Sequence, residues 1–411
     1  MSENKIETSS VKTPKHIFSS FLFKFRFHIA TVFITWIAIE IIAGVFFEFY
    51  GRDRFWAHIQ QDVQANLHQI DRKLIARFKM NAFDRDLGWD QRPNRRRTKR
   101  DLAGAIWKAN FDEMGRRVIP FKGKVVKISS YGDSYTLGGE VNDDQTWQFF
   151  LSELTETKVL NYGVDGYGTD QAVLKLKRNF ERGRKTEIVV LGIWSENINR
   201  IMNVYRQFYL ESRSPGLLFK PMLHKVDEKY EWLPNPLQAL EGPGDVVAAF
   251  EIAKKNDLWY RLRQRRPSIG FPYILAALSF ARYGAFYMTR DLNLWRMPEA
   301  IEKLEEIIRI GYRVSESYGA RLLVLFIPTN NDLKLYSKGQ SSTYRLFVEK
   351  IRKSYENTRL VVVDTIEERF DADKFSILPY RGHASPYGNK VIARAIHKAL
   401  RPLLGESYRG R

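Results

Sequence analysis

The sequence contains no cysteine and few histidines, and these scarcities remove several classes of chemistry. With no Cys among 411 residues, disulfide bonds, thiol catalysis and Cys-ligated metals are excluded. The 7 His are scattered, and no His-x-x-x-His pair or His and carboxylate cluster has the spacing of a metal site. We therefore expect no metal and no other cofactor, so any catalysis has to use hydroxyl, imidazole, carboxylate and amide groups.

Acidic residues are also in deficit, with 47 Asp and Glu against 66 Lys and Arg, which gives a net charge of +19. A nucleic-acid-binding protein is not indicated, because the basic residues are spread widely and no nucleic-acid-binding motif occurs. One basic cluster consists of Arg92, Arg95, Arg96, Arg97, Lys99 and Arg100. Two interpretations stand: a surface for anionic lipid or acidic polysaccharide, or a solvated flexible linker.

Charge is nearly absent from residues 28–50, whose central run 29–47 is interrupted only by Glu40. About 20 apolar residues cross the bilayer core as a helix, so this segment is predicted to be a transmembrane helix in contact with lipid. A carboxyl at the centre of a span costs about 2.5–3.5 kcal/mol on insertion scales. Glu40 is either a contact to a partner helix or a tolerated carboxyl that is protonated or snorkels to the interface.

The charges that flank this segment predict its orientation. Residues 1–27 carry five basic residues against two acidic ones, whereas the residues just after 50 have no such excess. By the positive-inside rule, the N-terminal tail 1–27 is cytoplasmic and the rest of the chain lies outside the cytoplasm. The run is longer than the apolar region of a cleaved signal peptide and lacks an Ala-x-Ala site, so we expect an uncleaved signal anchor.

The remainder of the chain divides by pattern. Apolar residues recur at helical spacing through 51–82, which predicts a stalk helix, and a polar, basic linker follows to residue 117. The catalytic body is expected over 118–411. Residues 200–297 break its regular pattern with turn signals and many aromatic and basic residues. They predict a mixed, mostly helical insertion over the active edge of the sheet.

Within the body, apolar strands alternate with amphipathic helices. Strands are expected at 125–130, 158–162, 187–193, 321–327 and 360–364, and helices at 146–154, 169–180, 298–318, 343–355 and 386–404. Such alternation is typical of a parallel, doubly wound sheet. The predicted fold class is α/β, a three-layer sandwich with a central, mostly parallel five-stranded sheet of flavodoxin-like type, preceded by one transmembrane helix.

Four short blocks at the ends of these elements carry candidate chemistry. Gly132-Asp133-Ser134 follows the first strand and places a serine hydroxyl at a carboxyl end of the sheet, where open α/β sheets hold their reactive groups. The glycine-rich block 161–168 follows the second strand, and the block 194–199 follows the third and contains Asn197, a candidate oxyanion donor. The block 383–389 opens with His383 and precedes the last helix, for which Ser385 is the expected N-cap.

In this order, the four blocks resemble those of the SGNH hydrolases, also called the GDSL esterase/lipase superfamily, over roughly residues 120–204 and 320–404. The resemblance implies that Ser134 is the nucleophile and His383 its general base. It also implies an oxyanion hole formed by the Ser134 N–H, the Gly166 N–H and the Asn197 side chain. Asp133 resembles the structural aspartate that braces the nucleophile loop. The α/β-hydrolase elbow is not matched, because Thr136 stands where Gly-x-Ser-x-Gly requires glycine.

Two positions depart from the family pattern. The third block reads Ser-Glu-Asn instead of Gly-x-Asn-Asp, which leaves Asn199 as a weaker alternative donor. The family usually has an aspartate three residues before the histidine, and here that residue is Tyr380. The acid that orients His383 is therefore open: Asp371, Asp373 or Asp364 by another loop path, or none, which would leave a Ser–His dyad.

The resemblance, together with the anchor, implies a serine esterase on the outer side of a bacterial inner membrane, acting on O-acyl esters, above all O-acetyl esters, of a polysaccharide. One alternative is a polysaccharide O-acetyltransferase with the same serine chemistry, and another is a lipase or thioesterase. A third, of a different class, is a noncatalytic polysaccharide-binding or assembly protein, which the absent aspartate favours. The expected partners are an acylated polysaccharide and the lipid bilayer, with room for membrane-protein partners of a polysaccharide assembly system.

Overall fold

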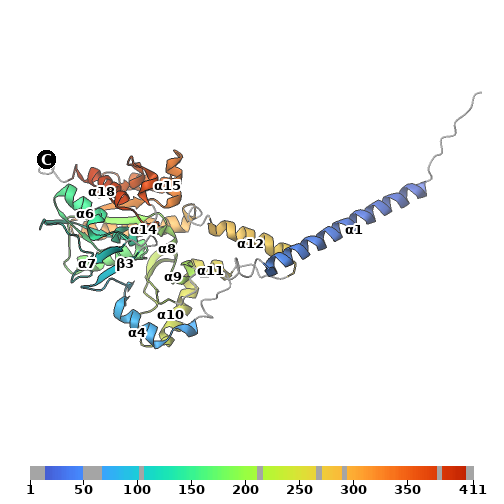
Figure 1. Cartoon of the computed structure of the whole chain (residues 1–411), viewed down its shortest axis with the longest axis horizontal. Helices are drawn as coiled ribbons and strands as arrows, with labels where there is room; N and C mark the ends of the chain where they lie inside the picture. Colours follow the sequence, from blue (N-terminus) through green and yellow to red (C-terminus); the bar gives the residue numbers. More distant parts are fainter. Residues whose placement is uncertain are drawn as a thin grey trace, which may run out of the picture. The chain divides into compact units, whose positions relative to one another are not determined.

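The computed structural model describes residues 14–49, 67–100, 106–210, 216–264, 271–288, 294–376 and 382–403. The chain divides into two compact units. The first comprises Met1–Gln60 and Arg265–Ala285 and is called the anchor unit after the anchor expected from the sequence. The second comprises Gln61–Gln264 and Phe286–Arg411 and is called the catalytic unit after the catalytic body expected there. Figure 1 shows the course of the chain through its helices and strands.

The catalytic unit is built on a five-stranded sheet in which every neighbouring pair is parallel. The strands are β5 (Val126–Tyr131), β6 (Lys158–Asn161), β7 (Ile188–Trp194), β10 (Arg321–Ile327) and β11 (Leu360–Asp364), in the spatial order β11-β10-β7-β5-β6. This is the flavodoxin-like order, with its topological switch point at β5 and β7. The predicted α/β class with a parallel, five-stranded, flavodoxin-like sheet is confirmed.

Helices cover both faces of the sheet because its strands are apolar on both faces. In β7, Val189 and Leu191 pack with α7 (Thr169–Glu181), α14 (Pro298–Ser317) and α16 (Arg345–Ser354). Ile188 and Val190 point the other way, to α6 (Trp147–Thr155) and α18 (Pro386–Leu400). Figure 1 shows α6 and α18 side by side on that face. Burial of each such Val, Leu or Ile side chain contributes about 1.5–3 kcal/mol.

The described residues of 83–117, a segment expected to be a linker with some ordered contacts, contain regular secondary structure. Two antiparallel hairpins occur here: β1 (Phe83–Asp84) with β2 (Gly88–Trp89), and β3 (Arg96–Arg100) with β4 (Ile106–Asn110). Side chains fix them to the sheet's loops: Arg97 forms an ion pair with Asp165 at 2.5 Å, and Tyr167 donates to the Trp89 carbonyl at 2.7 Å. The sequence Arg-Arg-Thr-Lys-Arg of β3 has no apolar alternation, so pattern reading cannot detect this strand.

The expected stalk helix over 51–82 is described only from residue 67. There the chain forms a short 3-10 turn, η2 (Leu67–Gln69), and a separate helix, α4 (Arg72–Asn81), so the described part is not one continuous helix. The Asp71 side chain caps α4 by accepting from the Leu74 N–H at 2.6 Å. Residues 51–66 lie outside the described residues.

The segment 200–297, expected to be a mostly helical insertion, contains five helices and one hairpin among its described residues. They are the end of α8 (Asn197–Arg200), α9 (Arg206–Leu210), β8 (Met222–Val226) with β9 (Lys229–Leu233), α10 (Pro243–Asn256), α11 (Leu258–Gln264) and α12 (Tyr273–Met288). The segment is not one body, however, because Arg265–Ala285 belongs to the anchor unit.

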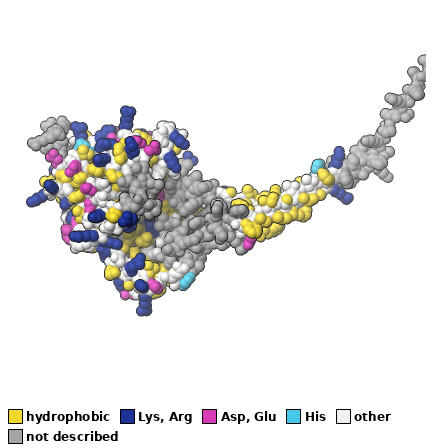
Figure 2. Space-filling view, in the orientation of Figure 1, with side chains coloured by type: hydrophobic (Ala, Val, Ile, Leu, Met, Phe, Trp, Pro, Cys, Tyr) yellow, Lys and Arg dark blue, Asp and Glu magenta, His cyan; other side chains and the backbone are white. Residues whose placement is uncertain are grey.

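The anchor unit contains α1 (Pro14–Phe46), which matches the apolar segment predicted at 28–50. Lys24–Phe49 is long and apolar enough to cross a membrane. Figure 2 shows hydrophobic side chains over the surface of this helix along much of its length. An exposed apolar surface of this extent is what lipid contact requires and what water disfavours.

Asp364 at the end of β11 gives the fold a testable pH dependence. Its Oδ1 accepts from the Tyr344 hydroxyl at 2.9 Å, while Oδ2 has no partner among the described residues. Burial raises the pKa of Asp364 from 3.8 to about 6. The folded-state pKa lies above the unfolded one because the fold favours the protonated carboxyl over the charged one. The stability that this protonated carboxyl contributes is therefore fully present below pH 3.8 and is lost as the pH rises through about 6.

Asp364→Asn keeps the acceptor for Tyr344 but cannot ionise. As the pH rises from 4 to 7, we expect its unfolding free energy to increase by about 2 kcal/mol relative to that of the natural chain. Urea unfolding of the full chain in detergent, followed by tryptophan fluorescence, measures this difference. An equal difference between the two chains at both pH values would contradict the expectation.

Candidate active site

The nucleophile loop begins directly where β5 ends. The Asp133 side chain accepts from the Tyr135 N–H at 2.9 Å and caps the single-turn helix α5 (Ser134–Leu137). Gly132 has to be glycine, because a Cβ there would lie 2.1 Å from the Thr136 hydroxyl and 2.7 Å from the Gly192 carbonyl of β7. This close packing of β5 on β7 fixes Ser134 at the switch point of the sheet.

Asp133 joins three of the four sequence blocks through one buried arginine. Its carboxylate is fully buried and lies 3.1 Å from Arg200 Nη1, and Arg200 Nε lies 2.8 Å from Glu196. Arg200 also donates to the Tyr167 carbonyl at 3.0 Å. Asp133 was expected to brace the nucleophile loop, and its bonds to Arg200 and to the Tyr135 N–H are the contacts through which it can do so. Arg200 itself was not identified from the sequence. Buried charges of this kind are stable only because each has a partner.

His383 lies against Ser134, with its Nε2 atom 2.9 Å from Ser134 Oγ. The start of α18 holds it there: Ser385 caps this helix by accepting from the Gly388 N–H at 3.1 Å, as predicted. The His383 carbonyl accepts from the Ser376 hydroxyl at 2.9 Å. The Tyr135 ring packs on the imidazole with 5.2 Å between ring centres. These contacts leave Nδ1 to be oriented by another group.

Glu140 is that group, with Oε2 3.0 Å from His383 Nδ1. The expectation that Asp371 or Asp373 orients His383 is not met. Asp371 caps α17 (Ala372–Phe375) by accepting from the Asp373 N–H, and its pKa is lowered by Lys374, whose ammonium lies 3.1 Å away. Asp364 is bonded to Tyr344, as described above. Tyr380, the family's aspartate position, lies outside the described residues.

The loop after Ser134 turns back sharply enough to bring Glu140 to the histidine. Gly138 and Glu140 both have left-handed backbone angles, with φ of 77° and 65°. The Gly139 N–H donates to the Ser134 carbonyl at 2.8 Å. A Cβ on Gly139 would lie 3.3 Å from the His383 ring, so a larger residue would crowd the imidazole. The turn thus places an acid six residues after the nucleophile on the far side of the histidine.

Arg117 stabilises the turn that carries Glu140 through hydrogen bonds to its main-chain carbonyls. Its side chain is buried, and Nε pairs with Asp143 at 3.0 Å. The guanidinium donates to main-chain carbonyls of the turn at Leu137, Gly138 and Val141. Strand β4 adds further bonds: the Lys108 N–H donates to Asn142 Oδ1 at 2.9 Å, and the Asn110 side chain and main-chain N–H donate to the Asp143 carboxylate at 2.6 and 3.2 Å. The segment expected to be a linker therefore supports the position of Glu140.

The expected oxyanion donors follow β5, β6 and β7 at one edge of the sheet. Asn197 is 1% exposed, and neither polar atom of its side chain has a hydrogen-bond partner in the described part of the chain. An unpaired buried amide costs about 1–3 kcal/mol, which a bound oxyanion would offset. The Ser134 and Gly166 N–H groups likewise have no main-chain acceptor among the described residues. Asn199, the weaker candidate, donates instead to the Glu196 carbonyl at 3.0 Å.

Arg206 adds a positive charge beside Gly166. Its Nη1 donates to the Gly166 carbonyl at 2.7 Å, and its guanidinium carbon would lie 3.0 Å from a Cβ on Gly166. Gly166 has φ of 79°, which also favours glycine. Burial, together with repulsion from Arg200, lowers the pKa of Arg206 to about 10, so it stays cationic at neutral pH. A cation here favours negative charge developing on a bound carbonyl oxygen.

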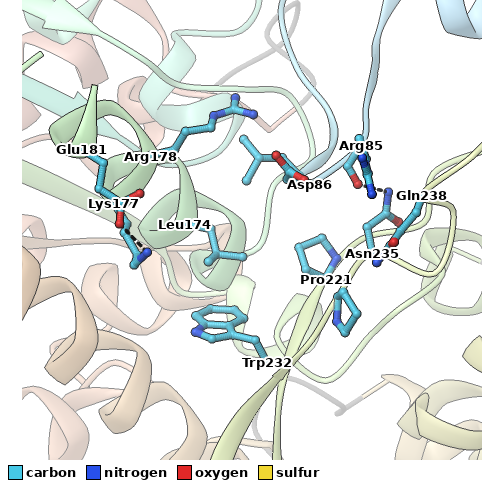
Figure 3. Close-up of a pocket in the computed structure, with 12 residues that line it drawn as sticks. Arg85, Asp86, Leu174, Lys177, Arg178, Glu181, Pro221, Trp232, Asn235 and Gln238 are labelled. Carbon is cyan, nitrogen blue, oxygen red and sulfur yellow. Dashed lines mark hydrogen bonds and ion pairs between the residues drawn. The ribbon is translucent and has the colours of Figure 1, made fainter. Parts of the chain in front are cut away.

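A separate cavity of about 270 Å³ lies between α7 and the β8–β9 hairpin, with Leu174, Pro221 and Trp232 among its lining residues (Figure 3). Three of its charged side chains are paired: Arg178 bonds Asp84 at 2.7 Å and Asp90 at 2.8 Å, and Lys177 bonds Glu181 at 2.5 Å. Neither Ser134 nor His383 lines it, so it is not the catalytic centre.

Sequence reasoning missed Glu140, Arg117, Arg200 and Arg206. One signal was available for Glu140: it is the first carboxylate after Ser134, and Gly138-Gly139 predicts a turn before it. For Arg117 and Arg206 no local signal exists, because their partners lie in other segments. Arg200 has one local partner, Glu196, but its bonds to Asp133 and to the Tyr167 carbonyl cross between segments and have no local signal. Together the side chains bring a hydroxyl, an imidazole, a carboxylate and an unpaired amide into one site, which is the set of groups that acyl transfer requires.

No protein-family model and no curated protein matches the sequence. Among solved structures, the chain is similar to a lipolytic protein of the G-D-S-L family from Desulfitobacterium hafniense, with 13% identity, a TM-score of 0.34 and coverage of 67% of this chain and 99% of that one. A family 3 carbohydrate esterase of Clostridium thermocellum has 12% identity, a TM-score of 0.32 and coverage of 68% and 98%. An acetyl xylan esterase of Butyrivibrio proteoclasticus has 9% identity, a TM-score of 0.31 and coverage of 70% and 66%.

One of these proteins is named as a member of the G-D-S-L family, but its identity and TM-score do not show the family of this chain. TM-scores and identities this low say nothing about substrate. The activity has to be inferred from the side chains of this chain.

Glu140→Gln tests the orienting acid. Gln keeps the size of the side chain but removes the charge that favours Nδ1–H and stabilises the imidazolium. We expect kcat for 4-nitrophenyl acetate to fall by about 10³- to 10⁴-fold with KM little changed. Asp373→Asn is the matched control and should leave kcat as it is. A larger loss in Asp373→Asn than in Glu140→Gln would contradict the assignment.

Arg117→Lys tests the support of Glu140. Lysine keeps the charge but cannot bond the turn's carbonyls at several points, so we expect kcat to fall by about 10- to 100-fold at constant KM, through about 1.4–2.7 kcal/mol of lost positioning. Arg116→Lys, the same change at a neighbour that pairs with Asp112, is the control. Because Arg117 is a positioning residue that acts through Glu140, the double variant with Glu140→Gln should be no slower than Glu140→Gln alone. Additive losses would show that Arg117 acts otherwise.

Proposed function

We propose that this chain is a serine esterase that cleaves O-acyl esters through an acyl-enzyme on Ser134. The single observation that carries the proposal is the continuous hydrogen-bonded series from Ser134 Oγ to His383 Nε2, at 2.9 Å, and from His383 Nδ1 to Glu140, at 3.0 Å. A serine hydroxyl is a weak nucleophile alone, and a base within hydrogen-bond reach, itself oriented by a third group, is what activates it.

In the acylation step, Ser134 Oγ forms a bond to the ester carbonyl carbon while its proton passes to His383 Nε2. The carbonyl oxygen becomes an oxyanion, which the N–H groups of Ser134 and Gly166 and the Asn197 amide stabilise. The carbon–oxygen bond to the alcohol then breaks, and His383 returns the proton to the leaving oxygen. The alcohol leaves, and the acyl group remains on Ser134.

In the deacylation step, water takes the place of the alcohol. His383 accepts a proton from that water as its oxygen bonds to the acyl carbon, and the same donors hold the second oxyanion. The bond to Ser134 Oγ breaks, His383 returns the proton to Oγ, and the free acid leaves. Through both steps Glu140 keeps the imidazole in the Nδ1–H tautomer and stabilises its protonated form.

We further propose that the enzyme is anchored in a bacterial inner membrane, with the catalytic unit on the outer side. The length and apolar character of Lys24–Phe49 support the anchor, and the excess of basic residues before it supports the orientation. An enzyme held there meets polysaccharides that are exported across the membrane. The substrate we propose is an O-acetyl ester of such a polysaccharide.

Positive charge near the site favours an acidic glycan over a neutral one. Arg206 borders Gly166, and the loop that carries Gly166 also holds Asp165, to which Arg97 of β3 is paired. The other basic residues of β3, Arg96, Lys99 and Arg100, are exposed. This surface matches the first interpretation of the basic cluster. The noncatalytic alternative rested on the absent aspartate, and Glu140 removes that support.

The test uses the full chain in detergent. A fluorophosphonate probe should label the natural chain and the control variants Ser337→Ala and His397→Ala, and should fail to label Ser134→Ala or His383→Ala. The natural chain should then release acetate from an O-acetylated uronic-acid polysaccharide in water. A folded chain that takes no label would contradict the serine mechanism. Acetate that moves only to an added sugar acceptor, never to water, would make the chain a transferase.

A further inference from the structure

Glu40, the one charge in the central run of α1, has a specific partner within the anchor unit. Its side chain is buried, and its carboxylate accepts from the main-chain N–H groups of Tyr273, at 2.5 Å, and Ile274, at 3.3 Å. These two residues begin helix α12. Of the two interpretations drawn from the sequence, the structure supports a contact between Glu40 and another helix.

The start of α12 needs no water to complete its hydrogen bonds. Pro272 precedes the helix and has no N–H. The N–H groups of Tyr273 and Ile274 bond Glu40, and those of Leu275 and Ala276 bond the Pro272 carbonyl at 3.1 and 3.3 Å. A helix normally exposes its first four N–H groups to water or caps them. A start without free N–H groups is the condition that hydrocarbon imposes on a main chain.

The contacts with α1 give the depth of this helix start. The Phe271 ring packs edge-on against Trp36, with 5.6 Å between ring centres, and Gly44 leaves room for the Tyr273 ring, 3.3 Å from where a Cβ would be. Trp36 lies at the middle of the candidate span Lys24–Phe49. If that span crosses the bilayer, Phe271 reaches the middle of the hydrocarbon and α12 returns from there.

The outward side chains of α12 are suited to lipid. Leu275 is 57% exposed and Leu278 is 62% exposed, and residues 271–281 contain no charge. Two exposed leucines next to an exposed Phe271 would be costly in water and favourable among acyl chains. At 16 residues, α12 is shorter than the roughly 20 residues that cross a bilayer.

Charges flank this segment at the right distances. Arg266 precedes Phe271 by five residues, which in extended chain reach about 17 Å. Arg282 follows Tyr273 by nine residues, or about 14 Å along a helix. Half of the hydrocarbon thickness is about 15 Å, so both guanidinium groups can reach head groups while the residues between them stay in lipid.

We propose that residues 271–281 form a re-entrant membrane segment that crosses the outer half of the bilayer to its middle, is capped there by Glu40, and contacts lipid acyl chains through Phe271, Leu275 and Leu278. This inference rests on the proposed membrane anchor. It makes the chain enter the bilayer twice, once through Lys24–Phe49 and once through residues 271–281.

The absence of cysteine makes a clean test available. Single cysteines are introduced into the full chain at Leu278, at Ile34 on the exposed face of α1, and at Leu346 on the exposed face of α16. Each variant is reconstituted in vesicles of phosphatidylethanolamine and phosphatidylglycerol. The reagent is present both inside and outside the vesicles, so it can reach both faces of the bilayer. The readouts are the rate of reaction with a charged, membrane-impermeant maleimide and the quenching of a thiol-linked fluorophore by lipids with spin labels on their acyl chains.

We expect Leu278→Cys and Ile34→Cys to react at least ten-fold more slowly than Leu346→Cys and to be quenched by the acyl-chain labels. If Leu278→Cys reacts as fast as Leu346→Cys while Ile34→Cys is protected, the anchor stands and the re-entrant segment is wrong. If Ile34→Cys is also reactive, the anchor itself fails. If Leu278→Cys reacts slowly with the maleimide but its fluorophore is not quenched by the spin-labelled lipids, protein and not lipid covers this position. That result would contradict the proposed lipid contact.

Glu40→Ala tests the cap. Without the carboxylate, two N–H groups would face hydrocarbon, so we expect the maleimide reaction at Leu278→Cys to speed up by about 5- to 30-fold, the size of a lost N-cap. Glu40→Gln retains one acceptor oxygen and should restore much of the protection, and the rate at Ile34→Cys should stay constant in both. An unchanged rate at Leu278→Cys in Glu40→Ala would show that Glu40 does not hold the segment.

Discussion

The hydrogen bond between Ser134 and His383 joins residues 249 positions apart, and the architecture of the catalytic unit makes it possible. Ser134 follows β5, at the switch point of the sheet, and His383 precedes α18, on the face that α6 also covers. The bond therefore depends on the parallel order of the strands, on the two apolar layers that fix the helices, and on the N-cap of α18. A change in any of these three features would separate Ser134 from His383.

Buried charges then set the finer geometry. Arg200 ties Asp133 to the loops after β6 and β7, and Arg117 ties the turn that carries Glu140 to the β3–β4 hairpin. Each guanidinium offers several donors in a rigid plane, so it fixes several carbonyls or carboxylates at once. A buried ion pair adds little net stability compared with an apolar contact, but its loss leaves an uncompensated charge. These pairs hold the shape of the site more than they hold the fold.

The fold could be predicted from the sequence because its signals are local. Strands β10 and β11 begin and end where the apolar runs do, and the blocks around Ser134 and His383 stand at element ends. The remainder could not be predicted, for physical reasons. Glu140 reaches His383 only through a left-handed turn supported by Arg117. The strand β3 is polar on both faces, so it looked like a linker. Glu40 has a partner 233 positions away, and no pattern near it names that partner.

The central claim is that Ser134, activated by His383 and Glu140, takes the acyl group covalently. The most direct measurement is the mass of the peptide that contains Ser134 after the full chain is mixed with an activated acetyl ester and quenched in acid within one turnover. The account predicts an added acetyl group on Ser134 that disappears when the quench is delayed, and a slower appearance of that group in Glu140→Gln. An unmodified Ser134 at every time, while ester cleavage continues, would contradict it.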